Sequence, residues 1–204
     1  MRTAAPRIRV ALLLCLFVAA ALCASAQNFT LKPLSPAEIQ SVNASLDKTL
    51  LPDGAGNVQV AGKQSFHVQI AGRTDVTLIP VRFSISEPGL VQGINRDTNE
   101  CGLYLVDASG KSRFDKVADS DTDGLIQCSG VDGVGLAHSP GAHPQVIFIF
   151  SAYTVHRSWS DPYLVSWSDN DGRYVIAALS APAGTAPTDK LTIAEARKWV
   201  DRRK

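Results

Sequence analysis

The sequence predicts an α+β fold: a mainly antiparallel sheet of about six to eight strands, with one helix near each end of the chain that follows residue 26. Short segments with alternating apolar and polar side chains recur from residue 66 to residue 179, separated by glycine and proline turns. Two capping boxes mark the expected helix starts, one at Ser35 and Glu38 and one at Thr192 and Glu195. A β-sandwich with appended helices is the alternative arrangement of the same elements.

Residues 1–26 have the three parts of a secretory signal peptide. A basic start is followed by an apolar run over residues 10–23 and by the small residues Ala24, Ser25 and Ala26. The apolar run is shorter than the roughly 20 residues that a membrane-spanning helix needs. We therefore expect cleavage before Gln27, no membrane span, and a single β-rich domain over 27–204 that is secreted or periplasmic.

The charge balance excludes some classes of partner. Removal of residues 1–26 leaves 178 residues with 17 basic and 19 acidic side chains. A chain of this length can bury a substantial core by itself. Because neither sign of charge dominates, nucleic acid and anionic membrane surfaces are not expected partners.

Two cysteines remain after the signal peptide, Cys101 and Cys128. An even number of cysteines in an oxidising compartment indicates a disulfide bond. Their spacing is not that of a CxxC redox motif, so the sequence predicts a structural bond between them.

The first helix is expected to begin after Ser35, with Pro36 at its first position. Four apolar side chains then fall on one helical face: Ile39, Val42, Leu46 and Leu50. The turn sequence at 52–54 ends this pattern. We therefore expect one helix that continues to about residue 50.

The first strands form an expected hairpin, with residues 66–70 and about 76–85 joined at Ala71-Gly72-Arg73. Pro80 cannot donate to a strand ladder, which predicts an edge strand or a bulge there. A polar loop is expected before Cys101, followed by a strand at 102–106, a turn at 107–110 and a return strand at 111–117.

The most buried strand is expected at residues 145–153, because apolar side chains occupy both of its faces. Residues 163–167 and 173–179 form a further expected hairpin around the turn sequence 169–172. The closing helix begins after Thr192 and is expected to bury Ile193, Ala196, Trp199 and Val200.

An acidic segment at 119–124 is the sharpest chemical signal of the chain. Asp119, Asp121 and Asp123 alternate and are followed by Gly124, and the carbonyl of Leu125 adds a further oxygen. These residues resemble the first half of the calcium loop of EF-hand proteins, and the resemblance implies a structural calcium ion. The second half departs from that pattern, because the twelfth position holds Gly130 instead of glutamate and the segment 128–130 is turn-like. A solvated acidic turn is the alternative.

A disulfide between Cys101 and Cys128 would bring residues 97–100 close to this acidic segment. Asp97 or Glu100 is then an expected source of the missing calcium ligand.

We expect residues 156–163, between the most buried strand and the last hairpin, to bind a partner molecule. Loops carried by a rigid sheet frequently hold binding residues. Histidine, arginine and aromatic side chains gather here and suit a protein or a sugar partner. The predicted binding residues are His156, Arg157, Trp159, Asp161 and Tyr163. Packing of the aromatic side chains into the core is the alternative.

The chain contains no GxSxG elbow, P-loop, dinucleotide fingerprint or HExxH motif. This favours a non-enzymatic exported protein that binds another macromolecule, of which an inhibitor or immunity-type partner of an envelope enzyme is one kind. Two alternatives stay open. One is a carbohydrate-binding module that uses Trp159 and Tyr163, and the other is a secreted hydrolase with a carboxylate or histidine site that follows no motif.

Overall fold

The computed structural model describes residues 28–88, 93, 95–117, 126–138, 141–183 and 189–202. Its strands are β1 (Phe29–Pro33), β2 (Ala55–Val60), β3 (Phe66–Ile70), β4 (Arg73–Pro88), β5 (Asn95–Asp107), β6 (Ser112–Lys116), β7 (Gln127–Leu136), β8 (Val146–Tyr153), β9 (Ser158–Ser168) and β10 (Arg173–Ala178). Its helices are α2 (Pro36–Ser45), α3 (Ile193–Asp201) and the short 3₁₀ helices η1 (Lys48–Leu50) and η2 (Gly62–Gln64). The predicted signal peptide lies outside the described residues.

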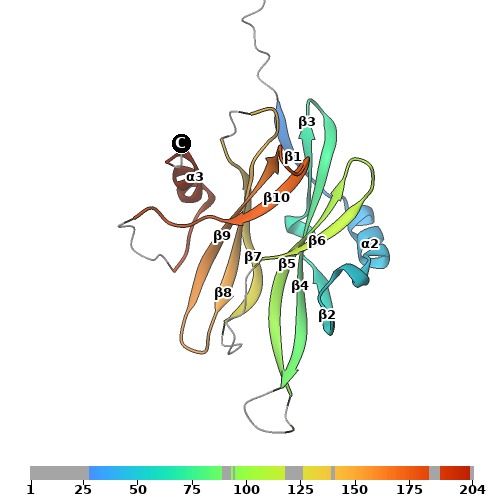
Figure 1. Ribbon diagram of the computed structural model, residues 1–204, viewed down its shortest axis with the longest axis vertical. Coiled ribbons are helices and arrows are strands. Elements are labelled where there is room, and N and C mark those ends of the chain that lie inside the picture. The colour runs from blue at the N-terminus through green and yellow to red at the C-terminus, as the bar shows by residue number, and fades with distance from the viewer. Residues whose placement is uncertain are drawn as a thin grey trace, which may run out of the picture.

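The strands form two antiparallel sheets, which confirms a mainly β, α+β protein (Figure 1). The first sheet has the order β1-β3-β4-β5-β6, with β2 also paired to β4. The second has the order β10-β9-β8-β7. Among the described residues there are therefore ten strands, more than the six to eight expected.

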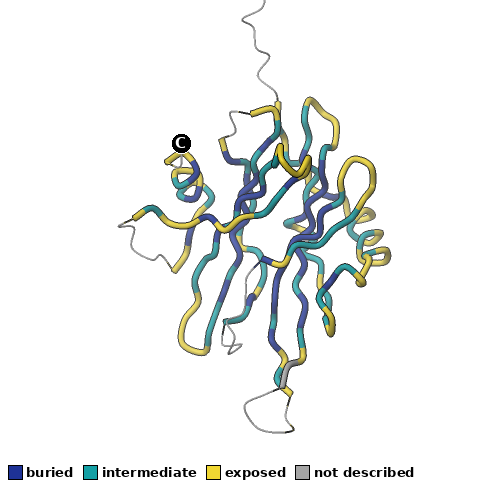
Figure 2. The backbone as a smooth tube through the Cα atoms, in the orientation of Figure 1, coloured by how far each residue is buried: buried dark blue, intermediate teal, exposed yellow. Residues whose placement is uncertain are grey.

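The two sheets pack face to face around the largest apolar cluster. The inner face of the first sheet contributes Leu78 and Leu103, and the inner face of the second contributes Phe148 and Phe150, all with 0% exposure. Figure 2 shows the buried segments running through the middle strands of both sheets. Face-to-face packing is the arrangement of the sandwich alternative, with the helices appended.

A helix covers each outer face, and the two helices lie on opposite sides of the molecule (Figure 1). In the second sheet, Ile147 and Ile149 pack against Ala196 and Val200 of α3. The prediction that β8 is buried on both faces is therefore confirmed. In the first sheet, α2 and η1 cover the outer face of β2, β4 and β5 through a smaller apolar cluster.

Both capping boxes are present, at Ser35 with Glu38 and at Thr192 with Glu195. The first helix is shorter than expected, because α2 ends at Ser45 and η1 follows it. The Asp47 carboxylate accepts the backbone N–H of Thr49 at 3.0 Å and its hydroxyl at 2.6 Å. An aspartate that captures its own downstream N–H caps a new turn, so the apolar face predicted from periodicity is divided between two helices.

Strand β4 is an interior strand of its sheet, so the edge position predicted from Pro80 is wrong. The alternative prediction, that this strand carries a bulge, is confirmed at Asp75, where the register against β3 passes from Val76 to Thr74. On one side, β3 pairs with β4 as far as Leu78 and β2 resumes the pairing at Val81. The Pro80 carbonyl faces this same side, where it accepts the N–H of Ala61 at 2.9 Å. The proline nitrogen therefore lies at the break between two partner strands, where no ladder bond is lost.

Two segments expected to be irregular are strands. Residues 128–130 belong to β7, where the register shifts against β8 between Cys128 and Gly130 and again between Val131 and Gly133. The polar segment 95–100 forms the first half of β5 and pairs with the end of β4. Both segments lack apolar alternation, which is the reason that periodicity missed them.

Candidate functional site

The predicted recognition residues lie on a hairpin and not on a long loop. Strand β8 connects to β9 through a tight turn, in which Thr154 donates its backbone N–H to the Arg157 carbonyl at 2.8 Å. His156 is exposed in this turn. Trp159, Asp161 and Tyr163 are alternate residues of β9 and therefore share one face of that strand.

Three of these residues form one linked group at the start of β9. The Arg157 guanidinium lies 5.0 Å from the centroid of the Trp159 ring, a cation–π contact. The Trp159 indole N–H donates to Asp161 Oδ1 at 3.0 Å. Burial raises the pKa of the Asp161 carboxyl, while the Trp159 hydrogen bond opposes that shift. One face of the Trp159 ring and its indole N–H thus already have partners within the chain.

Tyr163 takes no part in that group. Its ring packs edge-on against Phe150 at 5.7 Å between centroids, in the core between the sheets. Its hydroxyl donates to the Val117 carbonyl at 3.5 Å. Tyr163 therefore links the two sheets, as the packing alternative expected.

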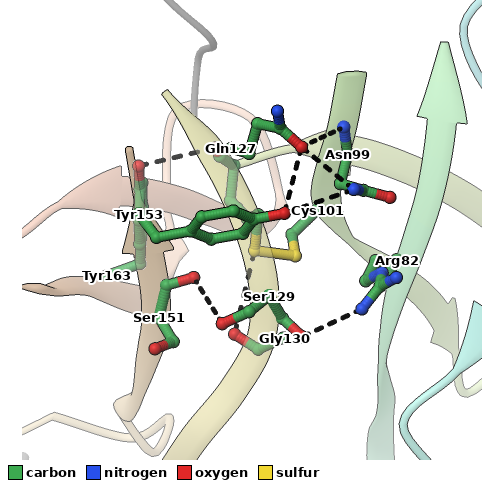
Figure 3. The surroundings of a disulfide bond; sticks show 11 residues. Arg82, Asn99, Cys101, Gln127, Ser129, Gly130, Ser151, Tyr153 and Tyr163 are labelled. Atoms are coloured by element: carbon green, nitrogen blue, oxygen red, sulfur yellow. Dashed lines mark hydrogen bonds between the residues drawn. A yellow bond between two sulfur atoms is a disulfide. The ribbon is translucent and has the colours of Figure 1, made fainter. Parts of the chain in front are cut away.

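The predicted disulfide is present, and it joins the two sheets (Figure 3). Cys101 on β5 and Cys128 on β7 are 5.8 Å apart at their Cα atoms, and both are buried. Beside the bond, Gln127 Oε1 accepts from Asn99 Nδ2 and from the Tyr153 hydroxyl, each at 3.0 Å. The bond and this polar group fix the position of β7 against β5.

The predicted calcium ligands Asp119, Asp121, Asp123 and Leu125 lie outside the described residues. Glu100, one expected supplementary ligand, is 1% exposed and pairs with Lys116 Nζ at 2.9 Å. It precedes Cys101 in β5 and therefore faces away from the disulfide. Within the described segments, no three His, Cys, Asp or Glu side chains gather as a metal site requires.

A row of polar side chains connects α2 to the first sheet. His67 Nδ1 lies 2.8 Å from the Thr77 hydroxyl, and Nε2 lies 3.0 Å from Glu38 Oε1. The order hydroxyl, imidazole, carboxylate is that of a hydrolase triad. Thr77 is only 8% exposed and faces the helix-covered side of the sheet. We therefore assign the row to holding the start of α2 in place.

The structure reveals a pocket of about 470 Å³ that the sequence did not predict. It lies between the two sheets at one end of the molecule and is lined from four segments, 75–76, 105–113, 167 and 171–174. We call it the rim pocket. Its volume is within the range of small-ligand sites, about 300–1,000 Å³.

The wall of the rim pocket is an interlocked set of rings around one carboxylate. Asp75 Oδ2 accepts the Tyr174 hydroxyl at 2.5 Å and lies 3.4 Å from His143 Nδ1. The His143 ring stacks on Trp167 at 4.1 Å, and Tyr174 meets Trp167 edge-on at 5.5 Å. Burial, followed by the Asp75 hydrogen bond and charge, raises the pKa of the Tyr174 phenol. Tyr174 therefore stays neutral and donates to the carboxylate.

Two features of the structure position the side chains of the pocket wall. The register between β3 and β4 passes from Val76 to Thr74, so Asp75 is the extra residue of a bulge. Bulges redirect side chains next to sites. Arg113 on β6 donates to the Tyr174 carbonyl and pairs with Asp115 Oδ2 at 3.2 Å. Burial lowers the pKa of Arg113, an effect opposed by Asp115 and reinforced by the charge of Arg173.

The residues of the rim pocket are dispersed in the sequence and carry no motif, so spacing rules do not find them. The bulge at Asp75 depends on pairing between β3 and β4. The contacts of Arg113 with Tyr174 depend on the packing of two sheets. The one local signal is the turn sequence at 107–110, which the sequence did identify as a turn.

Comparisons with known proteins do not identify a family for this chain. No family model, no curated protein sequence and no solved structure matches it. The function must therefore be argued from the rim pocket and from the linked group of Arg157, Trp159 and Asp161 at the start of β9.

Proposed function

We propose that the protein is an exported binding protein that recognises another protein through the rim pocket. The supporting observation is the pre-organised wall, in which Asp75, Tyr174 and Trp167 hold one another in fixed positions. Rigid aromatic side chains beside a cavity are typical anchors of protein interfaces. An inhibitor or immunity-type partner of an envelope enzyme remains one member of this class.

The tryptophans of β9 favour a protein partner over a sugar. A sugar-binding platform needs an open ring face, whereas one face of Trp167 is stacked by His143 and one face of Trp159 is covered by Arg157. Tyr163, the second residue of the carbohydrate alternative, packs against Phe150 in the core. Neither the pair Trp159 and Trp167 nor the pair Trp159 and Tyr163 supports an aromatic platform for a glycan.

One further observation supports export. The buried disulfide suits an oxidising compartment. In the described part of the chain, no helix has the length and apolarity to cross a bilayer. If residues 1–26 are the signal, the intact mass of protein recovered from the exported fraction will correspond to a chain that begins at Gln27.

The experiment is site-specific photo-crosslinking in the exporting host. A photoreactive residue at Ser109, which is exposed at the mouth of the rim pocket, is compared with one at Lys63, which is exposed and outside the pocket lining. A discrete protein adduct at Ser109 and not at Lys63 supports the proposal. Equal adducts at both positions, or none at Ser109, would overturn it.

Two assays address the alternatives. Retention on a glycan array that is lost in Trp159→Ala would indicate a carbohydrate-binding module. Turnover in a screen of ester, glycoside and peptide substrates would indicate a hydrolase. A binding protein requires neither result.

A further inference from the structure

The floor of the rim pocket is a continuation of the main core. Val76 and Leu105 are 2% and 3% exposed and belong to the apolar cluster between the sheets, as does Tyr174. An apolar group that enters the pocket therefore contacts core side chains.

The acidic side chains of the pocket are engaged within the protein. Asp75 accepts the Tyr174 hydroxyl. Asp107 Oδ1 accepts the backbone N–H groups of Ser109 at 2.9 Å and Lys111 at 3.0 Å. Asp171 Oδ2 accepts the Ser168 hydroxyl at 2.7 Å.

The basic side chains of the pocket have fewer hydrogen-bond and ion-pair partners within the protein. Arg113 has Asp115 as its partner, but Lys111 and Arg173 are both exposed and line the mouth of the pocket. Within the described residues, neither of these two side chains makes a hydrogen bond or an ion pair, although the pKa of the nearby Asp107 carboxyl is lowered by a hydrogen bond from a serine side chain and, to a smaller extent, by the charge of Lys111. Arg173 also lies close enough for its charge to lower the pKa of Arg113, after the larger effect of burial. An anion at this mouth would meet two exposed cations, either of which can donate a charge-assisted hydrogen bond.

We propose that the rim pocket binds the C-terminal residue of a partner protein, with an apolar side chain on Val76 and Leu105 and the terminal carboxylate on Lys111 and Arg173. This inference rests on the proposed function and names the part of the partner that is recognised. A C-terminal residue carries an apolar side chain and a carboxylate on the same carbon. Aspartate and glutamate side chains carry only one or two methylene groups beside the carboxylate, so they fill less of the floor of the pocket.

A free acyl acid also combines an apolar chain with a carboxylate. The experiment therefore distinguishes this ligand from the C-terminus of a protein. Two-dimensional NMR of the oxidised protein measures the Kd of the peptide acetyl-Gly-Gly-Leu with a free carboxylate, of the same peptide with a C-terminal amide, and of octanoate. We expect the acid to bind about tenfold or more tightly than the amide, because a hydrogen bond to a charged group contributes about 1.5–3 kcal/mol. Shifts should centre on the Trp167 indole and the 107–111 turn.

Matched variants complete the test. Lys111→Gln and Arg173→Gln should each weaken binding of the acid about tenfold without changing binding of the amide. Lys63→Gln, an exposed lysine outside the pocket, should change neither. All three residues are exposed, so each variant should keep the wild-type Tm.

The inference is overturned if the acid and the amide bind equally or neither binds. It is also overturned in favour of an acyl acid if octanoate binds more tightly than the peptide acid. These outcomes leave the crosslinking result at Ser109 untouched, so failure of this inference is distinguishable from failure of the proposed function.

Discussion

Gly102 lies where β5 and β6 approach too closely for a side chain. A Cβ atom there would overlap the Phe114 ring and lie 2.9 Å from the Asp115 carbonyl oxygen. The Phe114 ring packs edge-on against the buried Phe83 at 5.6 Å, which limits its movement.

We therefore expect Gly102→Ala to lower the free energy of unfolding by about 1–3 kcal/mol through overpacking. The matched control is Gly56→Ala, a strand glycine whose nearest contact for a new Cβ is Ser84 Oγ at 3.6 Å. That variant should change stability by less than about 0.5 kcal/mol. Urea denaturation of both proteins measures the difference, and equal effects would contradict the close approach.

Glu38 gives the start of α2 a dependence on pH. Hydrogen bonds from Ser35, followed by one from His67, lower the pKa of Glu38 from 4.5 to about 2. A carboxylate with a lowered pKa contributes stability that is fully present above about pH 4.5 and is lost as the pH falls towards 2. The pH window of interest is therefore acidic.

We expect the Tm of the wild-type protein to fall between pH 4.5 and pH 2 more steeply than that of Glu38→Gln, which has no carboxyl to protonate. Calorimetry across this range measures both curves. Because Glu38 is at the surface, high salt should reduce the difference. Parallel curves at low salt would show that the Ser35 and His67 contacts do not favour the charged carboxylate.

Among the elements, those with local signals were predictable. The helix starts at Ser35 and Thr192 follow from hydrogen bonds between residues three apart, which the sequence displays directly. Strand β8 was predictable because apolar side chains on both faces require cover on both sides. The turn at Ala71 and Gly72 was predictable as well, and both residues have a positive φ, of 49° and 80°.

The elements that were missed depend on partners distant in sequence. Strand β7 is rich in glycine and is held by β8 and by the disulfide of Cys128. The polar half of β5 is a strand because β4 extends to meet it. The rim pocket was missed for the same reason, since the bulge at Asp75 and the reach of Arg113 arise only when strands and sheets have paired.

The connection between β6 and β7 carries the acidic segment, and its calcium affinity remains a prediction. We expect millimolar calcium, but not magnesium, to raise the Tm of the oxidised protein above its value in EDTA. Calcium sites of extracellular modules have Kd values of roughly 0.1–1 mM, so the shift should saturate in this range. Asp121→Ala should abolish it. A shift equal in magnesium, or none in calcium, would identify the segment as a solvated acidic turn.

At the scale of the whole molecule, each sheet is built from one continuous part of the chain. Strands β1–β6 supply the first sheet and β7–β10 the second. The rim pocket and the disulfide both lie between these two parts. The geometry of the pocket therefore depends on how firmly the sheets are held together.

Removal of the disulfide should weaken the whole fold. Cys101 and Cys128 are 27 residues apart, and a cross-link over a loop of this length stabilises by about 3.5 kcal/mol in the chain-entropy model. We expect the double variant Cys101→Ala/Cys128→Ala to lose about that amount in chemical denaturation. The reduced wild-type protein serves as the comparison. A double variant as stable as the oxidised protein would contradict this role of the bond.

The disulfide has one more consequence, because the main chain passes from the described strands of the first sheet to those of the second at one place, between β6 and β7, and the disulfide is a second covalent link between the sheets. A single proteolytic cut between Val117 and Ile126 would leave two polypeptides, each holding a complete sheet, still joined by Cys101 and Cys128. The protein is thus already organised as two complementary fragments, and thiol reduction of the cut form would leave them joined only by the non-covalent contacts between the sheets.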